Sequence, residues 1–259
     1  MRRPSRLLLA LGTTLALALA ASGCSAGAAE DRRPGDSVTQ AEAQTLAQLL
    51  YRNHQRGGAD FVATAPYSDE AMLTLTGEID FRRSAGRAQA VTSFSDGRED
   101  DTRTLFFTPD HVWVGDVPGL ADALAGAGAA DAVYLRRPVT TGTTAGEPLL
   151  IDVLVELLLN LSAGTDDQPE AFLGGGYSWL GQRSIDSRLT SVFSLREGRT
   201  VAVSASGDLL TQFVTPLPGT DVDVTVTLSD HGPRRLDLPG VEETAEAGDH
   251  PDLAARFGV

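Results

Sequence analysis

Polar and apolar residues alternate along much of the chain after residue 70. From Leu73 to Phe81 the odd positions are apolar and the even positions are polar, with Gly77 as the exception, and residues 222–229 alternate without a break. A period of two places successive side chains on opposite faces of a strand. The same pattern predicts strands at 88–95, 104–108, 111–115, 133–136, 188–196, 199–204 and 209–215. Strands that each have one solvated face indicate a broad, curved antiparallel sheet.

Two longer stretches have helical periodicity instead. Residues 149–161 are apolar except at Asp152, Glu156 and Asn160, which recur every four residues. On a helix these three residues form one narrow polar stripe, so this helix is either deeply buried or lines a hydrophobic space. An earlier helix begins with the capping-box spacing of Thr39 and Glu42 and stops near residue 57. With a short helix at 168–173 and a loose helix or loop at 120–131, the pattern predicts an α+β fold whose helices cover the concave face of the sheet.

The first two dozen residues have the pattern of an export signal. Three arginines precede an apolar stretch over 7–21, which is shorter than the span of about 20 residues that a bilayer requires. Small residues then lead to Cys24, and this segment resembles the lipobox of bacterial lipoproteins. We therefore expect a signal peptide at 1–23 and a diacylglycerol and acyl anchor on Cys24; the alternative is an ordinary secretory signal whose cysteine is incidental. Cys24 is the only cysteine, so the sequence offers no disulfide framework.

Composition narrows the environment and the partners of the mature chain. The formal net charge is −14, and removing residues 1–23 deletes three arginines and no acidic residue, which leaves −17. This acidity argues against nucleic acid as a partner. The export signal and Cys24 predict a location on the outer face of the cytoplasmic membrane, and the acidity favours attachment there through acyl chains and not through a basic patch. We expect a flexible tether at 24–36, a single domain at 37–240 and an acidic tail at 241–259 that frays, with at most a short helix at 252–257.

Residues that could carry catalysis or bind a metal form no recognisable pattern. No Gly-x-Ser-x-Gly elbow is present, and the four histidines lack the spacing of a zinc site. The acidic run 96–101 lacks the EF-hand arrangement and reads as a solvated turn. The three glycines at 174–176 do not continue as a phosphate-binding loop, so we expect a hinge or a bulge there. We predict that the protein is not an enzyme and holds neither a metal nor a dissociable cofactor.

Three segments resemble one family of envelope proteins. Residues 75–81, 177–186 and 224–233 are similar to the first strand, the strand after the helices and the closing strand of the LppX/LprG lipoproteins of mycobacteria and other actinobacteria, which belong to the LolA/LolB-like group. Ser187 stands where that family often has glycine. The resemblance implies a half-open β-barrel that is plugged by helices and holds the acyl chains of a lipid or a lipoprotein.

A cavity of this kind would be lined by apolar residues of the concave face and of helix 149–161. The candidates are Leu73, Leu75, Ile79, Phe81, Phe94, Phe106, Trp113, Leu150, Leu154, Leu158 and Phe193. The same residues could instead pack together into a solid core, because protein interiors are normally close-packed. Two functions therefore remain open: a lipid-binding or lipid-transfer lipoprotein, and a non-enzymatic interaction or sensor module that contacts other envelope proteins.

Overall fold

A computed structural model describes residues 32–140, 149–217 and 222–259, and the part from Arg33 onward forms one compact unit. The predicted signal peptide, Cys24 and most of the predicted tether lie outside the described residues. None of the helices among the described residues is both long enough and apolar enough to cross a bilayer.

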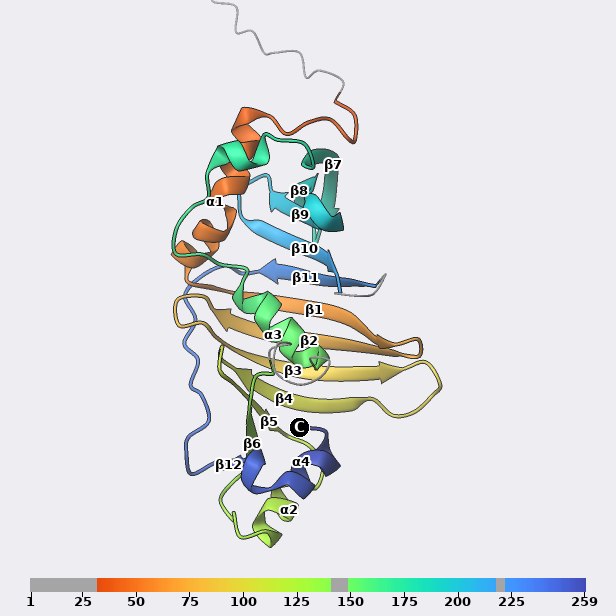
Figure 1. Ribbon diagram of the computed structural model, residues 1–259, viewed down its shortest axis with the longest axis vertical. Coiled ribbons are helices and arrows are strands. Elements are labelled where there is room, and N and C mark those ends of the chain that lie inside the picture. The colour runs from red at the N-terminus through yellow and green to blue at the C-terminus, as the bar shows by residue number, and fades with distance from the viewer. Residues whose placement is uncertain (1–31, 141–148, 218–221) are drawn as a thin grey trace, which may run out of the picture. The chain divides into compact units, whose positions relative to one another are not determined.

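The centre of this unit is a twelve-stranded sheet with the strand order β12-β6-β5-β4-β3-β2-β1-β11-β10-β9-β8-β7 (Figure 1). Neighbouring strands are antiparallel except for the pair β12–β6. The strands are β1 (Gly58–Ser68), β2 (Ala71–Asp80), β3 (Ala85–Phe94), β4 (Asp101–Phe107), β5 (His111–Gly115), β6 (Tyr134–Pro138), β7 (Ser178–Ile185), β8 (Arg188–Ser194), β9 (Thr200–Ser204), β10 (Leu210–Pro216), β11 (Asp223–Ser229) and β12 (Thr244–Glu246). The predicted α+β fold with a curved antiparallel sheet is confirmed.

The strand β1 was not expected from the sequence, although it joins the two halves of the sheet by pairing with both β2 and β11. Its buried positions are Gly58, Ala59, Phe61, Ala63 and Ala65, while Val62 is exposed. Alanine contributes little hydrophobic contrast, so the alternation of this strand is weak in the sequence. Small side chains are nevertheless suitable here, because they allow a helix to approach the concave face closely.

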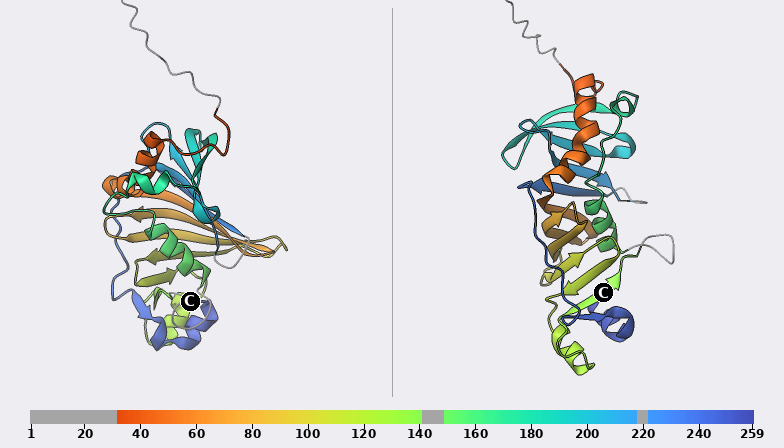
Figure 2. Two further views of the ribbon diagram at one scale, coloured as in Figure 1. Left: turned by 45° about the horizontal axis from the view of Figure 1, so that its top comes forward. Right: turned by 90° about the vertical axis from the view of Figure 1, so that its left-hand side faces the viewer.

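Two helices cover the concave face, which curves around them (Figure 2). The helix α1 (Gln40–Arg56) has the expected capping box: the Thr39 hydroxyl accepts a bond from the Glu42 amide at 3.3 Å, and the Glu42 carboxylate accepts one from the Thr39 amide at 2.9 Å. It ends at Gly57, whose φ of 93° is left-handed. The second helix is α3 (Leu150–Leu159). The shorter helices are α2 (Leu120–Gly126), η1 (Pro169–Phe172), η2 (Arg196–Gly198), η3 (Ala247–Asp249) and α4 (Pro251–Phe257).

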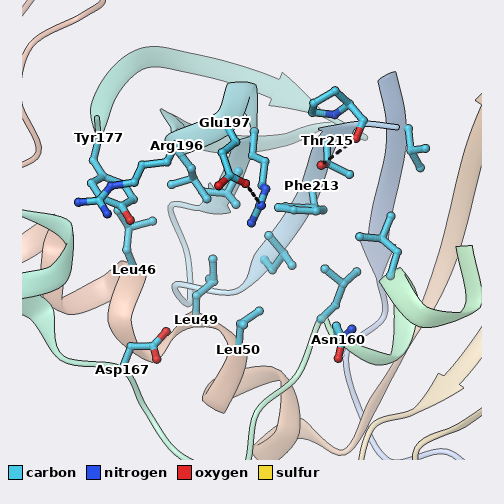
Figure 3. Close-up of a pocket in the computed structure, with 18 of the residues that line it drawn as sticks. Leu46, Leu49, Leu50, Asn160, Asp167, Tyr177, Arg196, Glu197, Phe213 and Thr215 are labelled. Carbon is cyan, nitrogen blue, oxygen red and sulfur yellow. Dashed lines mark hydrogen bonds and ion pairs between the residues drawn. The ribbon is translucent and has the colours of Figure 1, made fainter. Parts of the chain in front are cut away.

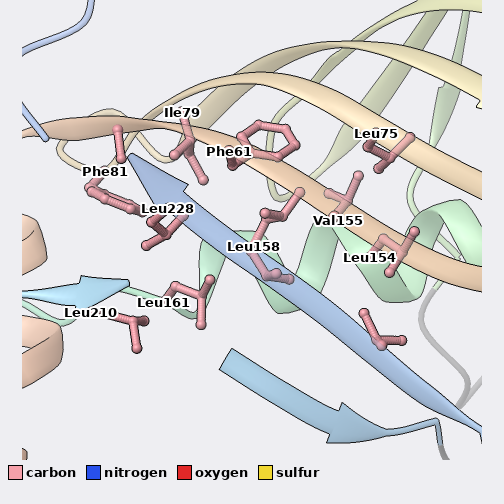
Figure 4. Close-up of a cluster of buried hydrophobic side chains, with 14 of the residues drawn as sticks. Phe61, Leu75, Ile79, Phe81, Leu154, Val155, Leu158, Leu161, Leu210 and Leu228 are labelled. Atoms are coloured by element: carbon pink, nitrogen blue, oxygen red, sulfur yellow. The ribbon is translucent and has the colours of Figure 1, made fainter. Parts of the chain in front are cut away.

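Between α3 and the first half of the sheet (β1–β6), the interior is filled with side chains. Leu154, Val155 and Leu158 extend from α3 into the cluster that contains Phe61 and Leu75 (Figure 4). All five are at most 1% exposed. This region is a close-packed core and not a cavity.

Buried polar contacts hold both ends of α3. Near its start, Asp152 is 1% exposed and forms a bidentate ion pair with Arg137 of β6, with N–O distances of 2.7 and 2.9 Å. Its carboxylate also accepts a bond from the Thr140 amide at 2.8 Å. Past the other end, the Leu161 carbonyl accepts a bond from the buried Asn53 amide group of α1 at 2.7 Å. A charge pair this deeply buried fixes the position of the helix, because separating it leaves an unpaired ion in the interior.

The C-terminal segment is not the frayed tail that the sequence suggested. Residues 244–246 pair in parallel with 134–136, and α4 buries Ala254 and Phe257 in a second cluster with Leu120 and Leu124 of α2. The expected short helix is present. The prediction of a mobile tail was wrong because it took acidity as a sign of disorder and overlooked the apolar positions that pack α4 against α2. The segment also covers β6, which would otherwise be an exposed sheet edge.

The folded unit begins earlier than the predicted boundary at residue 37. The Gly35 amide donates to the Trp179 carbonyl and the Trp179 amide donates to the Asp36 carbonyl, each at 2.8 Å. Ser37 then forms an antiparallel bridge with Ser178. The last part of the predicted tether is therefore held against the edge strand β7.

Candidate functional site

A pocket of about 1050 Å³ lies beside α3, between α1 and the second half of the sheet, which consists of β7–β11 (Figure 3). The segments that enclose it include α1, α3, the turn between β8 and β9, and the ends of β10 and β11 that face this turn. Its lining residues are Leu46, Leu49, Leu50, Val153, Glu156, Leu157, Asn160, Leu161, Asp167, Phe172, Tyr177, Leu195, Arg196, Glu197, Arg199, Val201, Leu210, Phe213, Thr215, Pro216, Leu217 and Val224.

The walls of the pocket are predominantly apolar because amphipathic elements meet there. The helix α1 contributes Leu46, Leu49 and Leu50, which recur at helical spacing, and Val201 and Val224 come from the inward face of two strands. Charged side chains also line the pocket, and all of them are solvent-exposed. An apolar interior with a few polar groups at its edge is the usual arrangement of a small-molecule site.

The nearly continuous apolar surface of α3 has two uses. Leu154 and Leu158 face the packed core, whereas Val153 and Leu157 face the pocket. The polar stripe that was predicted for this helix is divided in the same way: Asp152 is buried in its ion pair, while Glu156 and Asn160 line the pocket and are exposed. The sequence left open whether this helix is buried or lines a hydrophobic space, and the structure shows that it does both.

Aromatic and charged side chains stack at one side of the mouth. The rings of Phe172 and Tyr177 lie 5.3 Å apart, and the guanidinium of Arg196 lies 5.0 Å from the centre of the Tyr177 ring. In the same turn Glu197 has a left-handed φ of 62° and forms an ion pair with Arg199. The sequence predicted a two-residue turn at 197–198; the turn is there but spans 195–199, closed by a 2.7 Å bond from the Leu195 amide to the Arg199 carbonyl.

None of the eleven residues predicted to line a cavity lines this pocket. Seven are packed in the core: Leu73, Leu75, Ile79, Phe81, Leu154, Leu158 and Phe193. Leu150 packs against that core from the start of α3. The prediction placed the cavity between the concave face and helix 149–161, with lining residues mostly in β2–β5, whereas the pocket lies beside α3 over the second half of the sheet. Alternation identifies an inward face but does not say where the covering helix leaves a space above it.

Three aromatic residues of that prediction lie elsewhere. Phe106 lies between Leu105 and Phe107 in its strand, and because those two residues point into the core, Phe106 lies on the outer face. There its ring meets that of Tyr134 edge-on, with the ring centres 5.6 Å apart. Trp113 pairs with Phe106 across the strands and lies beneath the Arg136 guanidinium. These two were assigned to the wrong face because they lie in strands whose alternate residues are also large and apolar.

The third, Phe94, lies at the end of β3, where the Arg98 guanidinium stacks 4.1 Å from its ring centre. The acidic run that begins at Asp96 forms the turn after this strand. A bond from the Arg98 amide lowers the pKa of the Asp96 carboxyl, as expected for a carboxylate that closes a turn.

The remaining perturbed groups are not part of the pocket. Burial raises the pKa of Tyr134, and the charges of Asp116 and Glu243 act in the same direction. Burial lowers the pKa of His231 to about 4, assisted by the nearby Arg188. Among the described residues, no cluster of three or more histidine, cysteine or acidic side chains is placed to hold a metal ion.

Comparison with known proteins gives similarity at the level of the fold's outline only. No protein-family model matches the chain, and no curated protein matches it. The crystal structure of LprF from Mycobacterium bovis superposes with a TM-score of 0.46 and 12% identity over 79% of this chain and 98% of that one. An uncharacterized conserved protein from Thermus thermophilus superposes with a TM-score of 0.37 and 8% identity over 78% of this chain and 97% of that one. Similarity this distant assigns no family.

Proposed function

We propose that this protein binds acyl chains of a lipid or of an acylated molecule in the pocket beside α3, and carries them at the cell envelope. The single observation behind the proposal is an apolar pocket of about 1050 Å³ whose charged residues lie at the surface. Typical small-molecule pockets have volumes of about 300–1,000 Å³, so this one is large enough for a flexible chain.

The energetics of acyl chains favour this use of the pocket. Each CH₂ group removed from water contributes about 0.8 kcal/mol, so a chain of a dozen or more carbons gains on the order of 10 kcal/mol when it is enclosed. Apolar walls without specific polar partners suit such a ligand, because a hydrocarbon needs no hydrogen bonds. No catalytic step is required for binding and transfer.

The proposed location comes from the sequence. The export signal and Cys24 support a lipid anchor on the outer face of the cytoplasmic membrane, where two or more acyl chains give stable attachment. The segments that resemble the LppX/LprG lipoproteins support the same function. A protein anchored in this way would work next to the membrane from which its ligand comes.

The test uses a soluble form with Cys24→Ser, purified from a bacterial host and extracted with organic solvent. Mass spectrometry is expected to find co-purified lipid, and a fluorescent fatty acid is expected to bind saturably. Leu157→Trp fills the pocket and should reduce binding strongly. The matched control Val62→Trp adds the same bulk on the exposed outer face, where Val62 is 40% exposed, and should leave binding unchanged.

Two outcomes would overturn the proposal. One is a folded soluble form with neither co-purified lipid nor uptake of the fatty acid, which would leave the interaction or sensor module as the better explanation. The other is an equal effect of Leu157→Trp and Val62→Trp, which would show that binding does not depend on this pocket. Circular dichroism of each variant establishes that the fold is retained.

A further inference from the structure

The side chain of Arg196 has a specially built position at the mouth of the pocket. It lies against Tyr177, with the guanidinium centre 5.0 Å from the ring centre. Gly176 has a φ of +104°, and a Cβ placed there would come 3.1 Å from Cγ and 3.5 Å from Nε of Arg196. A Cβ on Gly174 would likewise approach an Arg196 terminal nitrogen, at 3.8 Å. The glycine run, which was expected from the sequence to be a hinge or a bulge, thus makes room for this arginine.

Arg196 keeps its hydrogen-bonding capacity free. A guanidinium that stacks on an aromatic face directs its five N–H donors outward in its own plane. The neighbouring carboxylate of Glu197 is already paired with Arg199. Among the residues that the structure describes, Arg196 forms no ion pair, although Glu156 and Asp167 belong to the same pocket.

An unpaired cation is notable because the mature chain carries a formal charge of −17. The overall charge repels anions at long range, but it is screened beyond a Debye length of about 8 Å at physiological ionic strength. At contact distance the local guanidinium decides the interaction. A planar fork of donors matches the geometry of a carboxylate or a phosphate.

We propose that the ligand is an anionic amphiphile, whose acyl chain occupies the apolar pocket while its carboxylate or phosphate headgroup binds the Arg196 guanidinium. This inference rests on the proposed acyl-binding function and adds the chemical class of the ligand. The shared chemistry is a negatively charged oxygen group at the end of a hydrocarbon chain, as in a free fatty acid or a phosphorylated lipid.

The experiment measures dissociation constants of the soluble Cys24→Ser form for three amphiphiles with the same hydrocarbon length: hexadecanoate, hexadecyl phosphate and hexadecanol. The anionic probes should bind more tightly than the neutral alcohol. Arg196→Gln should weaken the anionic probes about tenfold, as expected for the loss of a charge-assisted hydrogen bond in a partly solvated site. Hexadecanol binding should not change.

Two further variants separate charge from packing. Arg196→Lys keeps the charge but loses the planar fork, so it should restore part of the affinity for the anionic probes. The control Arg183→Gln removes an equivalent exposed arginine from β7 outside the pocket and should have no effect. Of hexadecanoate and hexadecyl phosphate, the probe with the lower dissociation constant identifies the headgroup that the site prefers.

The results distinguish this inference from the function on which it rests. If Arg196→Gln leaves the anionic probes unaffected, or weakens hexadecanol equally, Arg196 is only part of the wall and the headgroup assignment fails while acyl binding stands. If none of the three probes binds, the proposed function itself fails.

Discussion

The two halves of the sheet use the same alternating pattern for opposite purposes. Over β1–β6 the concave face is filled: Leu75, Ile79 and Leu105 are completely buried in one cluster with residues from α3. Over β8–β11 the concave face borders a pocket: Val201 and Val224 are buried there as well, but Phe213 is only partly buried. The strands differ little in composition. What differs is the covering helix, since α3 lies over the first half and only its side borders the second.

This difference shows how a small protein can combine a stable core with an open binding site. The filled half holds the close contacts that stabilise the fold, and the polar contacts at both ends of α3 fix the helix that both halves share. The pocket half leaves Leu50, Leu157 and Phe213 only partly buried.

The largest effect is expected from the ion pair that positions α3. Asp152→Ala leaves the Arg137 guanidinium, whose side chain is 9% exposed, without its partner in the interior. We expect a loss of about 3–5 kcal/mol in the free energy of unfolding, measured by urea denaturation. As a control, Arg87→Ala removes the surface pair with Glu78 and should cost less than about 1 kcal/mol. Equal losses would show that the buried pair does not hold α3.

The next effect compares two neighbouring leucines of α3. Leu158 is completely buried in the core, whereas Leu157 is only partly buried and borders the pocket. Leu158→Ala should reduce the free energy of unfolding by about 2–5 kcal/mol, because it leaves a cavity in a packed region. Leu157→Ala enlarges an existing space and should cost distinctly less. Similar losses for the two variants would contradict the contrast between a filled half and an open half.

A smaller effect depends on pH and involves His231, just past the end of β11. Burial, with the Arg188 charge as the next cause, lowers its pKa to about 4 from an ordinary 6.5. The unfolded chain therefore takes up a proton before the folded chain does, so stability falls as the pH decreases from 6.5 to 4 and is unaffected above this window. The loss should be on the order of 1–2 kcal/mol.

The check on His231 is a comparison with His231→Gln, which cannot take up this proton. Unfolding free energies of both proteins, measured across the same pH range, should converge as the pH falls. Parallel curves would show that His231 is not held in its neutral form.

The smallest effect concerns two glycines with left-handed backbones. Gly176 and Gly97 have φ values of +104° and +86°, but only a Cβ on Gly176 would meet another side chain, that of Arg196. Alanine at either position should destabilise the fold by about 1 kcal/mol. Only Gly176→Ala should also weaken hexadecyl phosphate binding severalfold. If both variants bind hexadecyl phosphate equally well, the glycine run does not determine the position of Arg196.

For most strands the sequence predicted which residues face inward and which face outward. It could not predict which side chains the inward residues pack against. Alternation gave β2 and β11 because their apolar residues are large, whereas β1 escaped notice since its inward residues are mostly alanine. The apolar circumference of α3 left burial and a hydrophobic space as alternatives, and the helix has both. Tertiary packing and the ion pair with Arg137 decide which side of the helix faces the core and which side faces the pocket.

The pocket itself was missed for the same reason. Leu46, Leu49 and Leu50 were recognisable as the apolar face of a helix, and Phe213 as part of a strand, but nothing local reveals that these elements meet without filling the space between them. The role of the glycine run is visible only when the turn containing Arg196, some twenty residues later, lies against it.

The central claim, that acyl chains occupy the pocket beside α3, can be tested most directly by locating a bound chain. Crystals of the soluble Cys24→Ser form grown with ω-bromohexadecanoate would reveal the end of the chain through anomalous scattering from bromine. The account predicts a bromine peak among Leu46, Val201 and Leu210, within the apolar walls. A peak between α3 and β1–β3, or no bound chain at a saturating concentration, would contradict it.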